Sequence, residues 1–166
     1  MLEVMYDLHF RRVYNYISYR INDHSNVDDL VSTVFLRAID KHAQFDSNRG
    51  SLSGWIIGIA RNVVIDYYRM RDRNQMTDIA AIEHSLPSDE NMPERIVVQN
   101  EEHRALITAL SELPERERQI IALKFGAELS NREIARQLGL SISNVGVLLF
   151  RCLRRLKARL SKGGLP

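Results

Sequence analysis

The chain has 166 residues, of which 45% are hydrophobic and 27% charged, enough for one domain or two small ones. Its single cysteine excludes an internal disulfide. No apolar run reaches membrane-spanning length and the N-terminus lacks a signal-peptide pattern, so we expect a cytoplasmic protein without membrane insertion.

The net charge of +2 is unevenly distributed along the chain. Residues 1–75 carry a net charge of +1, residues 76–100 a net charge of −4 and residues 101–166 a net charge of +5. The middle stretch contains Pro87 and Pro93 and has no sustained hydrophobic period, which is typical of a linker. The sequence therefore predicts an all-α protein made of two small helical domains, 1–75 and 101–166, joined by a flexible acidic linker, 76–100.

Three helices are predicted in the N-terminal domain, over residues 2–20, 26–41 and 52–73, because apolar side chains recur there at intervals of three and four. A short loop, 46–50, precedes the third helix. Trp55 lies on the apolar stripe, so we assign it to core packing. The expected apolar positions are Leu8, Val13, Tyr14, Ile17, Val27, Leu30, Val31, Val34, Phe35, Ala38, Ile39, Leu52, Trp55, Ile56, Ile59, Ala60, Val63 and Tyr67.

The C-terminal domain is predicted to contain helices over 101–111 and 115–125, followed by two capped helices. Ser130 and Glu133 have the spacing of a capping box. Gly139 then suits the end of that helix, and Ser141 caps the next one. Two helices joined by so short a turn are typical of a DNA-binding helix-turn-helix.

The final helix carries six positive charges and no negative one. One face is apolar and is expected to be buried, including the thiol of Cys152: Val145, Leu149, Cys152, Leu153, Leu156 and Leu160. Residues near the start of a recognition helix meet base edges, and later ones meet phosphates. Base-edge candidates are Ser143, Asn144, Gly146 and Val147, and phosphate candidates are Arg151, Arg154 and Arg155. A solvated basic helix end would explain the charge alone equally well.

Three motifs together resemble a known family. Residues 27–38 look like the core-polymerase-binding helix of bacterial sigma factors. Residues 50–69 resemble their promoter-melting helix, and residues 113–121 with 129–156 resemble their C-terminal DNA-binding region. Their order and the short chain resemble the extracytoplasmic-function (ECF) group of sigma factors.

The resemblance implies a transcription initiation factor without catalytic activity or cofactor, which binds core RNA polymerase, directs it to specific promoters and assists promoter melting. It also implies an anti-sigma protein as a further partner. The polymerase-binding candidates are Asp29, Ser32, Thr33, Leu36 and Arg37. The candidates for minus-ten DNA are Phe45, Asp46, Ser47, Asn48, Arg61, Asn62, Arg69, Arg71 and Arg73. Those for minus-thirty-five DNA are Arg132, Ser143, Asn144, Val147, Phe150, Arg151, Arg154 and Arg155.

The chain departs from the family pattern at two places. Ser32 and Thr33 stand where Gln-Glu is common, and residues 146–148 read Gly-Val-Leu where Lys-Ser-Arg is usual. Val147 and Phe150 leave apolar surface on the reading face. Such a surface suits either thymine methyl groups or a partner protein.

Two other classes of protein stay open. A helix-turn-helix repressor or activator would explain residues 113–160 but leaves the motifs around Asp29 and Asn62 without a task. A nucleic-acid enzyme would need a convergent catalytic set. The five histidines lack metal-ligand spacing, and Asp28 and Asp29 diverge around their helix. A gel shift with and without core polymerase distinguishes these classes.

Overall fold

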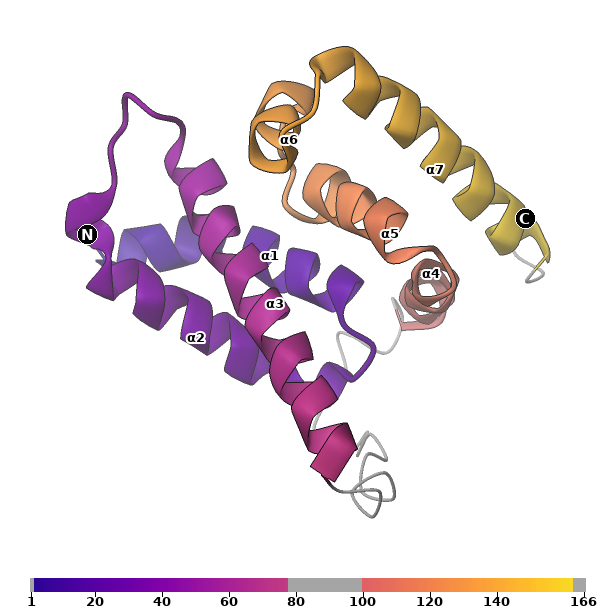
Figure 1. The fold of residues 1–166 in the computed structure, drawn as a ribbon, viewed down its shortest axis with the longest axis horizontal. Coiled ribbons are helices and arrows are strands. Elements are labelled where there is room, and N and C mark those ends of the chain that lie inside the picture. The colour runs from indigo at the N-terminus through magenta and orange to yellow at the C-terminus, as the bar shows by residue number, and fades with distance from the viewer. Residues whose placement is uncertain (1, 78–99, 163–166) are drawn as a thin grey trace.

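The computed structural model describes residues 2–77 and 100–162, and within these ranges every regular element is a helix (Figure 1). The N-terminal elements are α1 (Leu2–Arg20), η1 (His24–Asn26), α2 (Val27–Asp40), η2 (His42–Gln44) and α3 (Leu52–Thr77). The C-terminal elements are α4 (Asn100–Ser111), α5 (Glu115–Ile121), the π-helical segment η6 (Ala122–Gly126), α6 (Asn131–Leu138) and α7 (Ile142–Lys162). The predicted linker falls largely on residues 78–99, which lie outside the described ranges.

The N-terminal domain is a three-helix arrangement in which α1, α2 and α3 each contact the other two. Their shared core contains Tyr16, Val34 and Ile56, none of which is exposed to solvent. Asp28 and Asp29 lie in the first turn of α2, where the positive end of the helix dipole stabilises carboxylates. The long loop between α2 and α3 lies outside this core, so its side chains are available for binding.

The helix-turn-helix has the caps that the sequence predicts. The hydroxyl of Ser130 accepts a hydrogen bond from the backbone N–H of Glu133, and the Glu133 carboxylate accepts one from the N–H of Ser130. Gly139 ends α6 in the left-handed region, at φ 67°. The hydroxyl of Ser141 then accepts from the N–H of Asn144 at 3.1 Å. These local bonds fix the tight turn between α6 and α7.

The two halves pack against one another and share one continuous hydrophobic core. The segment η6 lies against α1, and Gly126 is so close to α1 that an added Cβ would stand 3.0 Å from the Tyr16 nitrogen. The buried guanidinium of Arg20 bonds to Glu115 at 3.0 Å, and Arg118 donates to the carbonyl of Tyr19. The sequence does not predict this contact, because it joins residues about a hundred positions apart.

Several predicted core positions are wrong. Leu8, Ile39 and Leu153 are exposed by 67%, 44% and 40%. Each stands at the edge of its apolar stripe, where a small rotation of the helix decides between core and solvent. The predicted helix over 115–125 is α-helical only to Ile121, because η6 widens its last turn.

Candidate nucleic-acid interface

The outward face of α2 carries the residues predicted to bind polymerase. Asp29, Ser32 and Leu36 are exposed, and Leu36 has 68% of its surface in solvent. The hydroxyl of Thr33 donates to the Asp29 carbonyl at 2.9 Å, so it is satisfied within the helix. Arg37 pairs with Asp66 of α3 at 3.0 Å. The face is therefore a mixed apolar and polar surface that the rest of the described chain leaves open.

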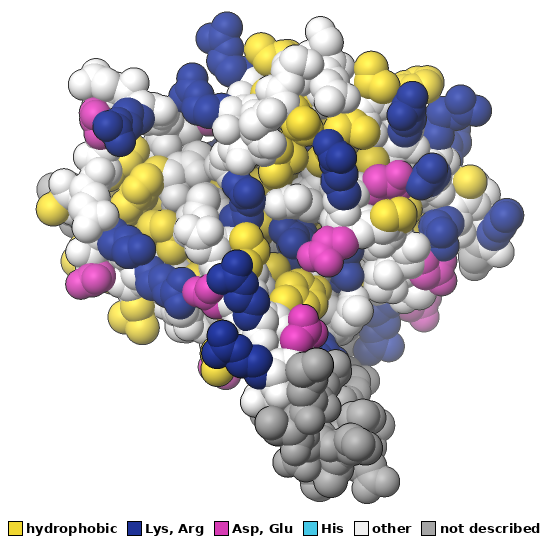
Figure 2. Space-filling view, viewed as in Figure 1, with side chains coloured by type: hydrophobic (Ala, Val, Ile, Leu, Met, Phe, Trp, Pro, Cys, Tyr) yellow, Lys and Arg dark blue, Asp and Glu magenta, His cyan; other side chains and the backbone are white. Residues whose placement is uncertain are grey.

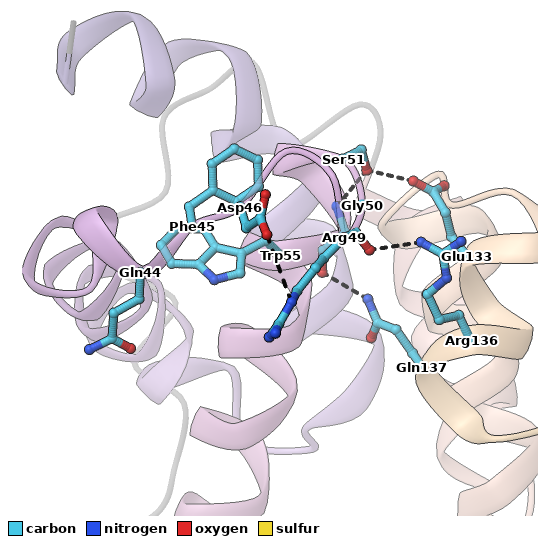
Figure 3. A pocket seen from close by; sticks show the side chains of 11 residues that line it. Gln44, Phe45, Asp46, Arg49, Gly50, Ser51, Trp55, Glu133, Arg136 and Gln137 are labelled. Carbon is cyan, nitrogen blue, oxygen red and sulfur yellow. Dashed lines mark hydrogen bonds and ion pairs between the residues drawn. The ribbon is translucent and has the colours of Figure 1, made fainter.

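The loop before α3 forms one wall of a cavity of about 270 Å³ (Figure 3). The ring of Phe45 packs against Trp55 with 5.4 Å between ring centroids. Asp46 accepts a hydrogen bond from the Asn48 backbone at 3.0 Å and lies 3.8 Å from the Arg49 guanidinium. The hydrogen bond and the ion pair both form within the loop, and Phe45 and Asp46 line the cavity.

The opposite wall of this cavity comes from the C-terminal domain. Glu133, Arg136 and Gln137 of α6 all line it. Figure 3 shows three hydrogen bonds that cross from α6 to the loop and the start of α3. Ser51 donates to Glu133 at 2.6 Å, Arg136 donates to the Arg49 carbonyl at 2.9 Å, and Gln137 donates to the Gly54 carbonyl at 2.8 Å.

Glu133 lies at the centre of this contact and is ionised. Burial by itself would raise the pKa of its carboxyl, but hydrogen bonds from Ser51 and Ser130 outweigh that effect and hold the pKa below its ordinary value. The same carboxylate therefore serves both the helix cap and the contact between the domains.

The remaining minus-ten candidates do not line the cavity. Ser47 and Asn48 are exposed on the loop, and Asn62 and Arg69 are exposed on α3. Arg71 donates to the Tyr67 hydroxyl at 3.4 Å, and Arg73 is exposed near the end of the described part of α3. Asn62 and these arginines thus follow the cavity along α3.

Arg61 is turned toward the C-terminal domain. Its guanidinium donates to the backbone carbonyl of Gln137 at 2.8 Å, and the side chain is half-buried. In this arrangement the Arg61 guanidinium is bonded to α6, whereas Arg69 and Arg73 of α3 are exposed to solvent.

The face of α7 predicted to read DNA is exposed, apart from Gly146, which is half-buried. Ser143, Asn144, Val147, Phe150 and Arg151 are exposed, and so is Arg132 on α6. The Arg154 guanidinium lies over the Phe150 ring at 5.9 Å, a cation–π contact that orients it. Arg155 pairs with Glu117 of α5 at 2.6 Å, which ties it to its own domain.

Cys152 lies on the opposite side of α7. The side chain is fully buried, and burial raises the pKa of its thiol to about 11. It is therefore a small core residue, as predicted.

The sequence does not predict all of the residues that line the cavity. Trp55 does pack, as its position on the apolar stripe predicts, but it is only half-buried and lines the cavity as well. No sequence signal marks Glu133, Arg136 and Gln137 for this site, because a tertiary contact brings them there. Over the space-filling face in Figure 2, basic side chains are spread across both halves, with apolar ones between them.

Among the described residues, no helix combines the length and apolar character needed to cross a membrane. Nor do the histidines, cysteine and carboxylates of residues 2–77 and 100–162 gather into a group able to hold a metal ion.

Comparison with known proteins gives two family matches. Residues 5–74 match the Sigma-70 region 2 model, and residues 103–156 match the Sigma-70, region 4 model. The chain is 31% identical over 133 residues to the ECF RNA polymerase sigma factor RpoE of Cereibacter sphaeroides, covering 80% of this chain and 69% of that protein. It is also 31% identical over 153 residues to the ECF sigma factor BldN of Streptomyces coelicolor, covering 92% of this chain but only 57% of BldN.

A solved structure has the same fold. It is the sigma factor RpoE of Bartonella quintana in complex with the anti-sigma factor NepR, with a TM-score of 0.72, 20% identity and 96% of each chain covered. The chain belongs to the sigma-70 family of bacterial RNA polymerase sigma factors. Within that family it is an ECF sigma factor, a transcription initiation factor that works with RNA polymerase at promoters.

Proposed function

We propose that this sigma factor has three binding surfaces: one for core polymerase, one for minus-ten DNA and one for minus-thirty-five DNA. Residues 1–75 bind core polymerase and minus-ten DNA, residues 101–166 bind minus-thirty-five DNA, and residues 76–100 join them. The proposed polymerase surface is the exposed face of α2 around Asp29 and Leu36, where an exposed leucine supplies contact area among polar groups. This role requires no catalytic group in the protein. A protein with this role acts in the cytoplasm, where the polymerase is.

The observation that carries the minus-ten assignment is the cavity beside the loop. Phe45 and Trp55 supply an aromatic wall of the kind on which an unstacked base packs. Asn62 supplies an exposed amide on the same helix, and Arg69, Arg71 and Arg73 supply positive charge beyond it. A strand separated from its partner could therefore lay one base in the cavity and run along α3.

On α7, the proposed division is between base edges and phosphates. Ser143, Asn144 and Val147 stand in the first turns of the helix and are exposed, so they are the candidates for base contact. Arg151 and Arg154 lie further along and are candidates for phosphate contact. Arg155 is a weaker candidate, because its pairing with Glu117 would have to break first.

An anti-sigma protein is the proposed regulator. The similar structure from Bartonella quintana contains one, and this chain exposes Ile142, Val147, Phe150 and Leu153 on α7. Apolar side chains grouped in this way on a helix are suited to a protein partner.

A gel shift on promoter DNA with and without core polymerase tests the proposal. A sigma factor of this design should give a sequence-specific complex only when core polymerase is present. Specific binding to a palindromic site by the protein alone, as a dimer, would instead identify a conventional helix-turn-helix regulator and would refute the proposal.

A further inference from the structure

We propose that α7 reads the minus-thirty-five element at A·T base pairs, through contact between thymine methyl groups and the side chains of Val147 and Phe150. The inference rests on the proposed function, which places the start of α7 against base edges. It specifies which bases this helix selects there.

The first half of α7 carries no charged side chain. From Ser141 to Phe150 every residue is neutral, and the first basic residue of the helix is Arg151. The commonest specific contact to a G·C pair is made by Arg or Lys, which donates to the guanine O6 and N7. Side chains near the start of a recognition helix are the ones that reach base edges. At those positions this helix therefore lacks the side chains that select guanine.

Two apolar side chains occupy the outward face instead. Val147 is 49% exposed and Phe150 is 64% exposed. At about 100° per residue, the two lie within roughly 60° of each other around the helix axis. In the major groove, thymine is the base that presents an apolar group, its C5 methyl, and apolar side chains contact it there.

The core of the domain does not account for these two side chains. The helix packs against α4, α5 and α6 and lies at the edge of the molecule (Figure 1). Val145 and Cys152, with no exposed surface, and Leu149, with 7%, supply its buried face. Val147 and Phe150 point away from that face, so their apolar surface is available to a ligand.

Asn144 extends the same surface with a polar group. It is exposed, and Asn144, Val147 and Phe150 follow one another at intervals of three residues. Each interval is about 4.5 Å along the helix axis, close to the spacing of successive base pairs at about 3.4 Å. An asparagine amide can bond to adenine at both N6 and N7. The three side chains therefore suit a short run of A·T pairs.

The basic residues of α7 come later and supply contacts that do not depend on sequence. Arg151 and Arg154 are exposed, and Arg154 lies over the Phe150 ring at 5.9 Å. Arg155 and Arg159 pair with Glu117 and Glu112 of their own domain, each at 2.6 Å. Positive charge beyond the start of the helix holds phosphates, so base preference falls to the neutral residues before it.

The test begins with the bases that the full-length protein selects in complex with core polymerase. Promoter fragments with randomised minus-ten and minus-thirty-five elements are incubated with this complex, and the bound fragments are sequenced. The minus-thirty-five element recovered should contain A·T pairs. Uracil then replaces each of its thymines in turn, because uracil pairs as thymine does and lacks only the methyl group.

Uracil at the thymine that Val147 contacts should weaken binding about fourfold, the effect expected for one methyl group removed from apolar contact. The Val147→Ala variant should bind the thymine and uracil promoters about equally. Val147→Arg should move the preference at that position toward G·C. Val4→Ala is the matched control, because Val4 is also an exposed valine but lies on α1, and this variant should keep the wild-type response to uracil.

The outcomes separate the thymine contact from the proposed function. A selected minus-thirty-five element dominated by G·C pairs, or one insensitive to uracil, overturns the thymine contact and leaves α7 as the minus-thirty-five surface. An equal response to uracil in wild type and Val147→Ala overturns the role of Val147. Selection at minus-ten with no preference at minus-thirty-five refutes both the thymine contact and the proposed function of α7, and assigns its apolar face to a protein partner.

Discussion

At the scale of single residues, function depends on which polar side chains the fold leaves unoccupied. Asn62 and Arg61 are neighbours on α3 and are both candidates for minus-ten DNA. Asn62 is exposed, whereas the Arg61 guanidinium is bonded to the Gln137 carbonyl. Adjacent positions on a helix differ by about 100° in direction, so one faces solvent and the other faces the C-terminal domain.

Replacing Asn62 with alanine should therefore impair discrimination among minus-ten sequences while leaving polymerase binding intact. The amide is exposed, so its loss removes little packing, and one base contact is worth about 1–3 kcal/mol. Transcription from a set of minus-ten variants measures this. Asn22→Ala, an exposed asparagine between α1 and η1, is the control. Equal preference across the set in wild type and the Asn62 variant would remove Asn62 from the site.

Arg154 gives a test of phosphate contact on α7. The Arg154→Ala variant should weaken minus-thirty-five binding about equally for all sequences and lower the salt slope by about one unit. Replacing Val147, near the start of the helix, with a polar residue should instead change which minus-thirty-five sequence is preferred. Salt titrations of the polymerase complex on several promoters measure both effects, with Arg159→Ala as control. A changed preference with an unchanged slope in Arg154→Ala would mean that α7 lies differently in the groove.

At the scale of elements, two glycines illustrate opposite constraints on the helices of the C-terminal domain. An added Cβ at Gly146 in α7 would meet no atom within 4 Å. At Gly126 in η6 it would stand 3.0–3.1 Å from the nitrogen and Cα of Tyr16. The backbone of α1 cannot move aside as a flexible side chain can, so this close approach depends on glycine.

The Gly146→Ala variant should raise the free energy of unfolding by about 0.5–1 kcal/mol, because alanine is the better helix former. Gly126→Ala should lower the free energy of unfolding by about 1–3 kcal/mol, because the added methyl group overpacks against α1. If the two halves separate as a result, the fluorescence of Trp55 should be quenched more strongly by acrylamide. Thermal and urea unfolding of both variants measure the difference. If Gly126→Ala were as stable as wild type, the contact between η6 and α1 would be looser than described.

At the scale of the whole molecule, the two halves meet around a buried cluster of basic groups. Arg20 and Arg118 are 4% and 6% exposed, and His24 lies near Arg118 and near His103 of the other half. Burial lowers the pKa of both histidines, and for His24 the nearby His103 and Arg118 lower it further, while Asp23 opposes them. Burial at the interface therefore favours the neutral form of both imidazoles.

This arrangement predicts a loss of stability in mild acid. Unfolded imidazoles take up a proton near their ordinary pKa of 6.5, whereas the folded ones do so only at lower pH. The unfolded state then binds more protons, so the free energy of unfolding falls as the pH decreases through about 6.5. Melting temperatures between pH 7.5 and 5.5 measure this, and a combined His24→Gln and His103→Gln variant should show a flatter profile. An equally steep profile in that variant would assign the effect to other groups.

The sequence by itself determined most of the local structure. Spacing of three and four placed the helices, because a helix must turn one face to the core. Ser130, Glu133, Gly139 and Ser141 predicted the turn of the helix-turn-helix, since capping depends only on neighbours along the chain. The family could be recognised from the same local motifs, and the comparisons confirm it.

Only the tertiary structure decided how the two halves meet. Glu133, Arg136 and Gln137 look like ordinary polar positions of a surface helix, yet they close a cavity whose aromatic wall lies some eighty residues earlier. Arg61 reads as a DNA contact but is held by a backbone carbonyl. Such contacts join segments that lie far apart in the sequence, through complementary shape and through backbone groups that lack a partner in their own helix. The hydrophobic periodicity of the sequence does not indicate them. The sequence therefore determines the helices and their caps, and the packing of η6 and α6 on the N-terminal domain determines which surfaces are open.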